Sequence, residues 1–244
     1  MLDPALQTLL LPLQSDAVPL NATDRVLLSR ARYAPELSVL DKEQLACEQS
    51  FAPDRDKLQT AGYTVVPEAE TSDFDLVLVL PTRQRQEARA QLARAVAKAK
   101  PGGWVIAAAP NSEGAKTLEA DLAALLGAVD RMSKYKCRVI WGEASGSLNR
   151  DLLAEWQALD APRPVLDGAY VSRPGVFAWD RVDAASQLLA DHLPEMLSGT
   201  GADLGCGFGF LARTVLERCP KVSVLDLYEA EKRALDLAQQ NLKS

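Results

Sequence analysis

The sequence predicts an α/β protein made of two successive units, each built on a mostly parallel sheet covered by helices. In residues 1–143, short apolar runs rich in β-branched residues alternate with amphipathic helical stretches. Near the C-terminal end, Asp203–Phe210 joins an apolar run to a helical stretch through glycines at alternate positions. A strand, a glycine loop and a helix in this order form a repeating unit of parallel sheets.

In the first unit, residues 2–20 predict a short helix and a loop. Six apolar runs predict strands, at Val26–Leu28, Leu37–Leu40, Tyr63–Val66, Leu76–Leu80, Trp104–Ala109 and Cys137–Trp141. Apolar positions at helical spacing predict helices over Gln84–Lys100 and Gly114–Leu126. The run Leu76–Leu80 is apolar throughout, which is typical of a strand covered on both faces.

Residues 144–173 predict a linker, because glycines and prolines interrupt one short helix there, over Leu152–Leu159. A second unit occupies residues 174–244. It is expected to contain a helix at Ala184–Leu197, a turn at Thr200–Gly201, a buried strand ending at Ala202–Leu204, a helix over Leu211–Leu216, a strand at Lys221–Leu227 and a helix at Glu231–Leu242. Two strands are too few for a stable doubly wound domain. We therefore expect that this unit leans on the first or that the chain is a fragment.

Composition excludes several classes of protein. The net charge of −6 argues against a broad basic surface for nonspecific nucleic-acid binding, although a local basic patch stays open. No apolar stretch is long enough to span a membrane, so we expect no membrane partner. Four dispersed cysteines without C-x-x-C spacing favour reduced thiols in the cytoplasm and no metal site. The single histidine, His192, is expected at a helix end rather than in a catalytic triad, and we expect a monomer.

The glycine loop is suited to a ligand. Without Cβ atoms, Gly205, Gly207 and Gly209 let a ligand lie against the backbone, and the amides of the next helix favour acceptor groups. Asp203 supplies an acceptor of its own. The spacing D-x-G-x-G-x-G differs from the dinucleotide pattern because position 210 is phenylalanine, and no Lys-Ser/Thr follows, which excludes a P-loop. A strand-to-helix turn that binds nothing fits the loop alone equally well.

An acid after the next strand would accept hydrogen bonds from ribose hydroxyls. Asp226 lies inside the predicted strand and Glu229 at its end, and the phase of the following helix favours Glu229. Either residue could instead be a solvated acid beside Lys232 and Arg233.

With these residues, the sequence resembles the class I S-adenosylmethionine-dependent methyltransferases. More narrowly, Pro174–Phe177 and Asp183–Leu189 resemble the segment ahead of the glycine motif in bacterial ribosomal RNA guanine-N2 methyltransferases, the small-subunit enzyme being nearer. Asn111–Gly114 and Lys136–Arg138 match it as well. The resemblance implies tandem Rossmann-like class I methyltransferase folds, the first degenerate and the second present here only as its N-terminal part.

The resemblance also implies S-adenosylmethionine as cofactor and assigns roles to residues. Those that would hold it are Asp203, Gly205, Cys206, Gly207, Gly209 and Glu229 (or Asp226), with Phe177, Asp183 and Ser186 closing the pocket. Phe177 would face the sulfonium with its ring, or would instead be a core aromatic that packs residues 144–173 against the second unit.

Catalysis in this family depends on an Asn-Pro-Pro-aromatic motif that positions the guanine amine for methyl transfer. The chain contains no Asn-Pro-Pro, so no catalytic residue is assigned and the chain alone is expected to be inactive. In the first unit, Leu80-Pro81-Thr82-Arg83 stands where a catalytic copy would carry the motif. We therefore interpret the first unit as a copy that has lost cofactor and catalytic residues.

Two basic sets in the first unit could contact RNA phosphates. One comprises Arg83, Arg85 and Arg89, and the other comprises Lys134, Lys136 and Arg138, which would alternate along one strand and share a face. Both could equally be solvated basic surface. The leading hypothesis is methylation of guanine N2 in small-subunit (16S) ribosomal RNA, with that RNA or the small subunit as partner. The alternatives are a non-catalytic RNA-binding or ribosome-assembly module, and a methyltransferase of large-subunit RNA or of a protein.

Overall fold

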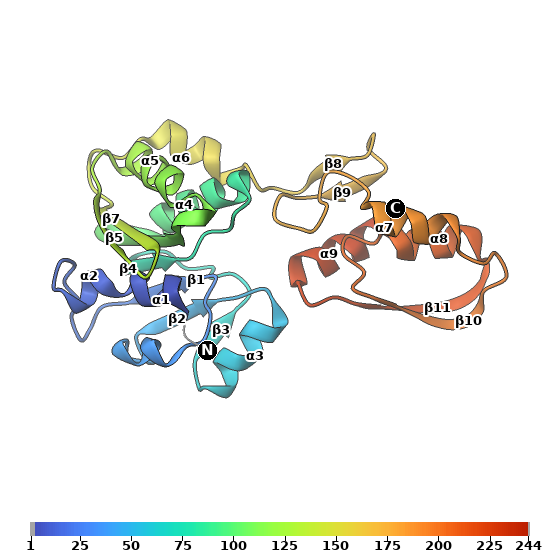
Figure 1. Cartoon of the computed structure of the whole chain (residues 1–244), viewed down its shortest axis with the longest axis horizontal. Coiled ribbons are helices and arrows are strands. Elements are labelled where there is room, and N and C mark those ends of the chain that lie inside the picture. Colours follow the sequence, from blue (N-terminus) through green and yellow to red (C-terminus); the bar gives the residue numbers. More distant parts are fainter. Residues whose placement is uncertain (1–2, 244) are drawn as a thin grey trace. The chain divides into compact units, whose positions relative to one another are not determined.

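The structure, a computed structural model, describes residues 3–243 and divides into two compact units. The first runs through Asp160 and the second begins at Ala161. Figure 1 traces both units along the chain.

The first unit is built on a seven-stranded sheet in the order β3-β2-β1-β4-β5-β7-β6. The strands are β1 (Val26–Ser29), β2 (Leu45–Glu48), β3 (Thr64–Val66), β4 (Phe74–Val79), β5 (Ala99–Pro110), β6 (Asp130–Lys134) and β7 (Cys137–Glu143). The first five run parallel to one another, whereas β7 is antiparallel to both β5 and β6. This mostly parallel α/β arrangement confirms the Rossmann-like fold expected for the first unit.

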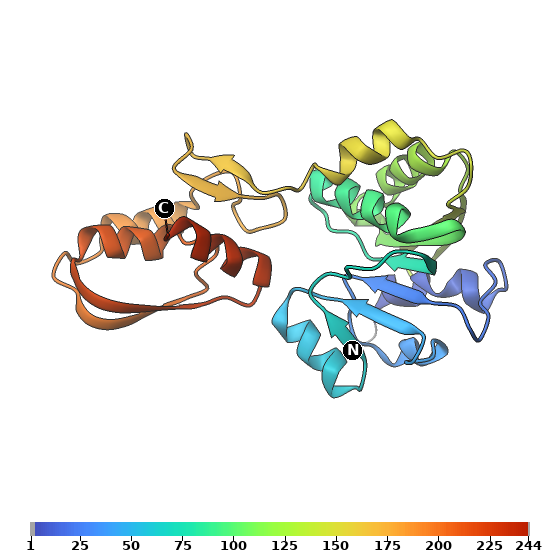
Figure 2. The same cartoon turned by 180° about the vertical axis from the view of Figure 1, so that it is seen from behind.

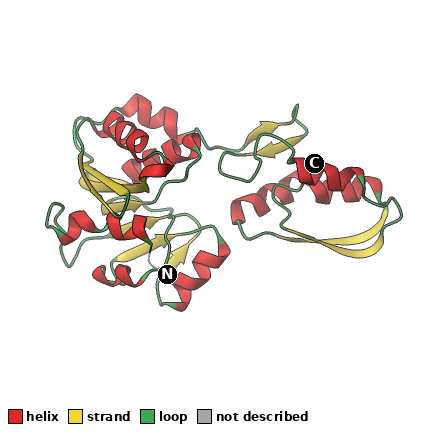
Figure 3. Ribbon diagram, in the orientation of Figure 1, coloured by secondary structure: helices red, strands yellow, loops and turns green. Residues whose placement is uncertain are grey.

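Helices cover both faces of this sheet, as Figures 1 and 2 show from opposite sides and Figure 3 shows by element type. One face carries α1 (Pro4–Leu9), α2 (Leu11–Gln14), the 3₁₀ helix η1 (Pro35–Val39) and α3 (Ala52–Thr60). The other carries α4 (Arg85–Lys98), α5 (Ala115–Leu126) and α6 (Arg150–Gln157), with the 3₁₀ helix η2 (Asn111–Glu113) ahead of α5. Strand β4 serves both layers: Leu76 and Leu78 enter one core, and Val77 and Val79 enter the other.

Two predictions for this unit are wrong. Leu37–Leu40 does not form a strand, because Pro35 begins η1 there, and this turn buries Leu37 while leaving Val39 43% exposed. Lys134, Lys136 and Arg138 do not alternate along one strand. They span a hairpin in which Lys134 ends β6, Tyr135 and Lys136 turn with positive φ, and Arg138 lies in β7.

The structure divides the segment 144–173, expected as a linker, between the two units. Helix α6 belongs to the first, since Trp156 is buried in the core beneath α4 and α5. Beyond it, the guanidinium of Arg94 on α4 donates to both carboxylate oxygens of Asp160, at 2.7 and 2.9 Å. Asp160 is only 1% exposed, so this ion pair closes the end of the first unit.

The second unit begins with the antiparallel hairpin of β8 (Arg163–Val165) and β9 (Tyr170–Ser172). Strands β10 (Ser198–Leu204) and β11 (Lys221–Tyr228) pair in parallel. The helices are α7 (Ala184–Asp191), α8 (Phe210–Arg218) and α9 (Lys232–Asn241). Val176, Phe208, Ala234 and Leu237 form the buried core.

In the second unit, three predictions differ from the structure: the end of α7, the turn at Thr200–Gly201 and the burial of β10. Helix α7 ends at Asp191, with His192 as its exposed C-cap, rather than continuing to Leu197. Thr200 and Gly201 lie within β10 instead of forming a turn, because they pair with Val224 and Leu225 of β11. Within the described residues β10 pairs with β11 alone, and none of its residues is buried, so the expectation of a buried strand is wrong. Leu204, at its end, is 77% exposed.

Candidate functional site

The loop between β10 and α8 is shaped by its glycines. Gly205, Gly207 and Gly209 all have positive φ, at 82°, 54° and 95°, a conformation that L side chains rarely adopt. The amides of Gly205 and Cys206 both donate to the carbonyl of Tyr228, at 2.7 and 3.1 Å, which fixes the loop against the end of β11. A Cβ atom on Gly205 or Gly207 would meet open space. These two glycines therefore leave bare backbone beside free volume.

Gly209 has a different function. A Cβ atom there would lie 3.1 Å from the Cα of Ala238, so this glycine allows the start of α8 to approach α9 closely. Sequence spacing alone placed all three glycines under a ligand. In the structure, two of them face open space and the third sets the packing of two helices.

Glu229 reaches the loop from the end of β11. One carboxylate oxygen accepts a hydrogen bond from the amide of Gly207 at 2.9 Å, and the other accepts from the amide of Glu231 at 3.0 Å. Asp226, the alternative acid, is exposed in the middle of β11, opposite Ala202. The structure thus brings Glu229 and not Asp226 to the glycine loop.

Asp203 lies one residue before the end of β10 and is half-buried. Its Oδ2 atom is buried and has no hydrogen-bond partner among the described residues. Burial raises the pKa of this carboxyl, the nearby Glu229 raises it further, and the amide of Ala212 opposes the shift. An unsatisfied buried carboxylate oxygen costs free energy, so it marks a position where a hydrogen-bond donor would be stabilised.

Cys206, between the first two glycines, is 6% exposed. Burial, with the added charges of Asp203 and Glu229, raises the pKa of its thiol to about 11. A thiol in this state is a poor nucleophile. Its place in the site is therefore that of a small packed side chain.

A residue that the sequence analysis missed supports the loop from below. Asn241, on α9, is 3% exposed; its amide nitrogen donates to the carbonyls of Phe208 and Val171, and its amide oxygen accepts from the amide of Val171. It thereby ties the loop to strand β9. Its signal in the sequence is its position three residues after Ala238 on the apolar stripe of α9, where a buried amide needs internal partners.

The residues expected to close the pocket lie ahead of β10. Asp183 caps α7, accepting hydrogen bonds from the amides of Ala185 and Ser186 at 3.0 and 3.1 Å. The Ser186 hydroxyl lies 3.5 Å from the same Asp183 oxygen. Phe177 is 74% exposed, so it is not a core aromatic; its neighbour Val176 enters the core instead.

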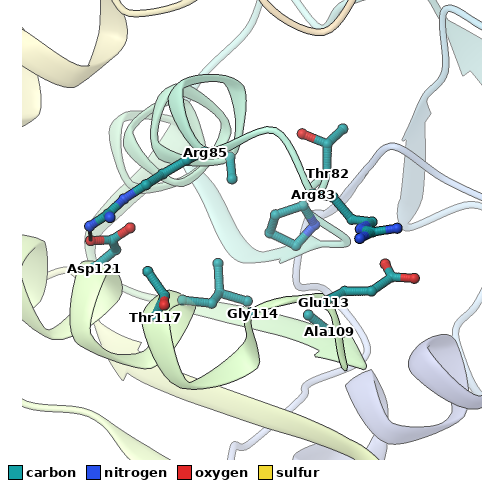
Figure 4. A pocket seen from close by; sticks show the side chains of 11 residues that line it. Thr82, Arg83, Arg85, Ala109, Glu113, Gly114, Thr117 and Asp121 are labelled. Carbon is teal, nitrogen blue, oxygen red and sulfur yellow. Dashed lines mark ion pairs between the residues drawn. The ribbon is translucent and has the colours of Figure 1, made fainter. Parts of the chain in front are cut away.

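The basic residues predicted to contact RNA lie in two kinds of environment: Arg89 is held by other side chains of the first unit, and the exposed ones are Arg83, Arg85, Lys134 and Lys136. Arg89 donates to both carboxylate oxygens of Asp121 and stacks on the ring of Trp156 at 4.5 Å, so its guanidinium holds α4, α5 and α6 together. Arg85 is largely exposed, 4.0 Å from Asp121. Lys134 is exposed beside Tyr135. Arg83 and Lys136 lie at the carboxyl edge of the sheet, where Figure 4 shows Arg83 beside a pocket of about 190 Å³.

Two other features, a metal-holding group and a membrane-spanning helix, are absent from the residues that the structure describes. Within residues 3–243, no three His, Cys, Asp or Glu side chains gather as a metal-holding group. Nor does any helix in that range have the length and apolar character needed to cross a membrane.

Comparison with known proteins agrees with the geometry of the loop. Residues 167–244, which include β10, the glycine loop and Glu229, match the family profile described as the methyltransferase small domain. The matched range includes both Asp203 and Glu229, which border the loop that follows β10.

Curated relatives extend the similarity into the first unit. The chain is 30% identical over 196 residues to the ribosomal RNA small subunit methyltransferase C of Psychromonas ingrahamii, covering 78% of this chain and 55% of that protein. It is 30% identical over 175 residues to the protein of the same name from Vibrio vulnificus, covering 70% and 50%. The chain thus spans about half the length of the curated relatives it matches.

A solved structure shows the same fold. The 16S rRNA N2 G1207 methyltransferase of T. thermophilus, solved in complex with AdoMet and guanosine, superimposes with a TM-score of 0.77 at 20% identity. The alignment covers 99% of this chain and 66% of that one. The seven-stranded sheet of the first unit therefore has the Rossmann-like fold expected from the sequence, and the second unit, with its two parallel strands, follows the fold of the corresponding part of that structure.

Proposed function

We propose that the glycine loop of the methyltransferase small domain binds S-adenosylmethionine. The observation that carries the proposal is the buried Asp203 oxygen without a partner, at a loop whose Gly205 and Gly207 face open space. A ligand with hydroxyl or ammonium groups would supply the donors that this oxygen lacks. The residues present therefore fit the cofactor implied by the family.

Each residue contributes in a defined way. The bare backbone of Gly205 and Gly207 lets the cofactor approach the chain, and Asp203 accepts a hydrogen bond from it. Glu229 is already held by the amides of Gly207 and Glu231, so its remaining lone pairs are positioned to accept from ribose hydroxyls. When bound, S-adenosylmethionine supplies an activated methyl group for transfer.

We further propose that the substrate is guanine N2 of small-subunit ribosomal RNA. Support comes from the relatives named ribosomal RNA small subunit methyltransferase C and from the structure solved with AdoMet and guanosine. Chemistry on a base requires it to be unpaired or flipped out of its helix. Because bacterial ribosomal RNA is in the cytoplasm, we expect the protein there, with the small subunit or its RNA as partner.

Replacing Glu229 with glutamine is expected to weaken S-adenosylmethionine binding by roughly ten- to one-hundred-fold, the usual worth of a hydrogen bond to a charged group. The matched control is Asp226→Asn, which removes a carboxylate from the same strand at an exposed position. Isothermal titration calorimetry of the whole chain measures both. Equal losses in the two variants would contradict the role given to Glu229, and a wild-type chain that ignores the cofactor would favour a non-catalytic module.

The substrate is tested with the full-length protein and labelled S-adenosylmethionine on isolated small subunits, large subunits and naked RNA. Label recovered as N2-methylguanosine in 16S RNA is the expected result. Label in large-subunit RNA or in protein would refute the substrate while leaving the cofactor site intact.

A further inference from the structure

The loop after β1 in the first unit repeats the hydrogen bonds of the glycine loop. Strand β1 ends with Ser29 opposite Glu48, and two residues later the Ala31 amide donates to the Glu48 carbonyl at 2.9 Å. Strand β10 ends with Leu204 opposite Tyr228, and two residues later the Cys206 amide donates to the Tyr228 carbonyl. Ala31 is thus the counterpart of Cys206.

The residue that follows the neighbouring strand, β2 in the first unit and β11 in the second, also has the same hydrogen bonds in both units. Gln49 follows β2 as Glu229 follows β11, and both accept a hydrogen bond from the amide two residues on, that of Phe51 or Glu231. The other end of each side chain reaches the preceding loop: the Gln49 amide nitrogen donates to the Ala31 carbonyl, and Glu229 accepts from a loop amide. The first unit therefore keeps the geometry of the site with an amide in place of the carboxylate.

The charge of the two loops is opposite. Arg30 stands at the counterpart of Gly205, with a positive φ of 55°, and Arg32 stands at the counterpart of Gly207. A residue with a side chain is disfavoured in this conformation by about 1–2 kcal/mol. The first unit thus has arginine at a position where the second has glycine. It also has the neutral Gln49 at the position where the second has the acidic Glu229.

These arginines line a cavity of about 570 Å³ beyond the carboxyl ends of β1, β4 and β5. The sheet order reverses between β1 and β4, and ligands of open α/β sheets bind in the crevice at this point. Arg83, after β4, and Lys136, in the β6–β7 turn, line the same cavity. Pro81, Thr82, Arg83 and Glu113 also line the smaller adjoining pocket of Figure 4.

The cavity carries more positive than negative charge. Four of its lining residues are cationic and two are acidic, Asp3 and Glu113. Asp3 is engaged by Arg32 at 3.1 Å and by the amides of Ala5 and Leu6. Among the described residues, Arg83 and Lys136 form no ion pair and no side-chain hydrogen bond, and both are exposed. A positive cavity in a chain of net charge −6 is suited to an anion.

We propose that this cavity of the first unit binds phosphate groups, held by Arg30, Arg32, Arg83 and Lys136. Guanidinium groups match phosphate oxygens through paired hydrogen bonds, and the lysine adds a point charge. The phosphate belongs either to the RNA backbone, which rests on the proposed function, or to a free nucleotide. The copied site has thus changed its ligand from one held by carboxylates to one held by cations.

The test measures binding by the full chain of guanosine 5′-monophosphate, of guanosine without phosphate, and of a short single-stranded RNA. We expect Arg83→Gln/Lys136→Gln to weaken binding of the phosphate-bearing probe by about tenfold or more and to reduce the slope of log affinity against log salt for the single-stranded RNA by about 1.4. The control Arg55→Gln/Lys57→Gln removes the same charge from α3, outside the cavity, and should change neither. Arg30→Gly, which keeps the backbone conformation, should also weaken binding.

Binding of the mononucleotide supports a nucleotide site, and binding of RNA alone supports a backbone site. Equal losses in both double variants, equal binding of guanosine and its monophosphate, or no binding of either phosphate-bearing probe would overturn the proposal. S-adenosylmethionine binding should be unchanged in Arg83→Gln/Lys136→Gln, so failure here is distinguishable from failure of the cofactor site.

Discussion

Replacing Asp160 with alanine is expected to destabilise the first unit by about 3–5 kcal/mol, because it leaves the Arg94 guanidinium without its buried partner. The Asp160 side chain is 2% exposed, and both of its oxygens accept from Arg94. Urea unfolding followed by tryptophan fluorescence measures the loss, since Trp104, Trp141 and Trp156 lie in this unit.

Asp56→Ala is the matched control. It breaks the Arg55–Asp56 ion pair on α3, where the aspartate side chain is 62% exposed, and exposed pairs contribute at most about 1 kcal/mol. If the two variants lost the same stability, the Arg94–Asp160 pair would not close the first unit as described.

Replacing Gly209 with alanine is expected to destabilise the second unit more than replacing Gly205. Both changes put a side chain at positive φ, at a cost of about 1–2 kcal/mol. Only at Gly209 would the new Cβ also meet the backbone of Ala238 at 3.1 Å, which adds about 1–3 kcal/mol of overpacking. Hydrogen exchange of the α8 and α9 amides in the two variants measures the difference.

Gly205→Ala serves as the internal control, because its Cβ would enter open space. Similar loss of protection in both variants would mean that the approach of α8 to α9 does not depend on Gly209.

The sequence was most informative where one local pattern decides the structure. The all-apolar run at β4 and the alternate glycines after β10 correctly predicted a buried parallel strand and a glycine loop between a strand and a helix. The helix phase after β11 also favoured Glu229 over Asp226, and Glu229 is the acid that reaches the loop. Such features depend on residues near one another in the chain.

Features that depend on distant contacts could not be predicted. The role of Asn241 depends on its hydrogen bonds to Val171 and Phe208, which lie far away in the sequence. Gln49 was not identified as the counterpart of Glu229, because strand β2 was not predicted and its four residues carry a weak alternation. The apolar run Leu37–Leu40 predicted a strand, but Pro35 begins the 3₁₀ helix η1 there instead.

We infer that the loop after β10 holds the cofactor, whereas the corresponding loop after β1 in the first unit does not. An NMR titration of the ¹⁵N-labelled chain with S-adenosylmethionine tests it most directly, since each backbone amide reports its own surroundings. We expect shifts of the amides of Gly205, Gly207 and Glu229, with the amides of Arg30 and Arg32 unchanged. Shifts at the arginine loop instead, or none at either loop with cofactor in large excess, would contradict it.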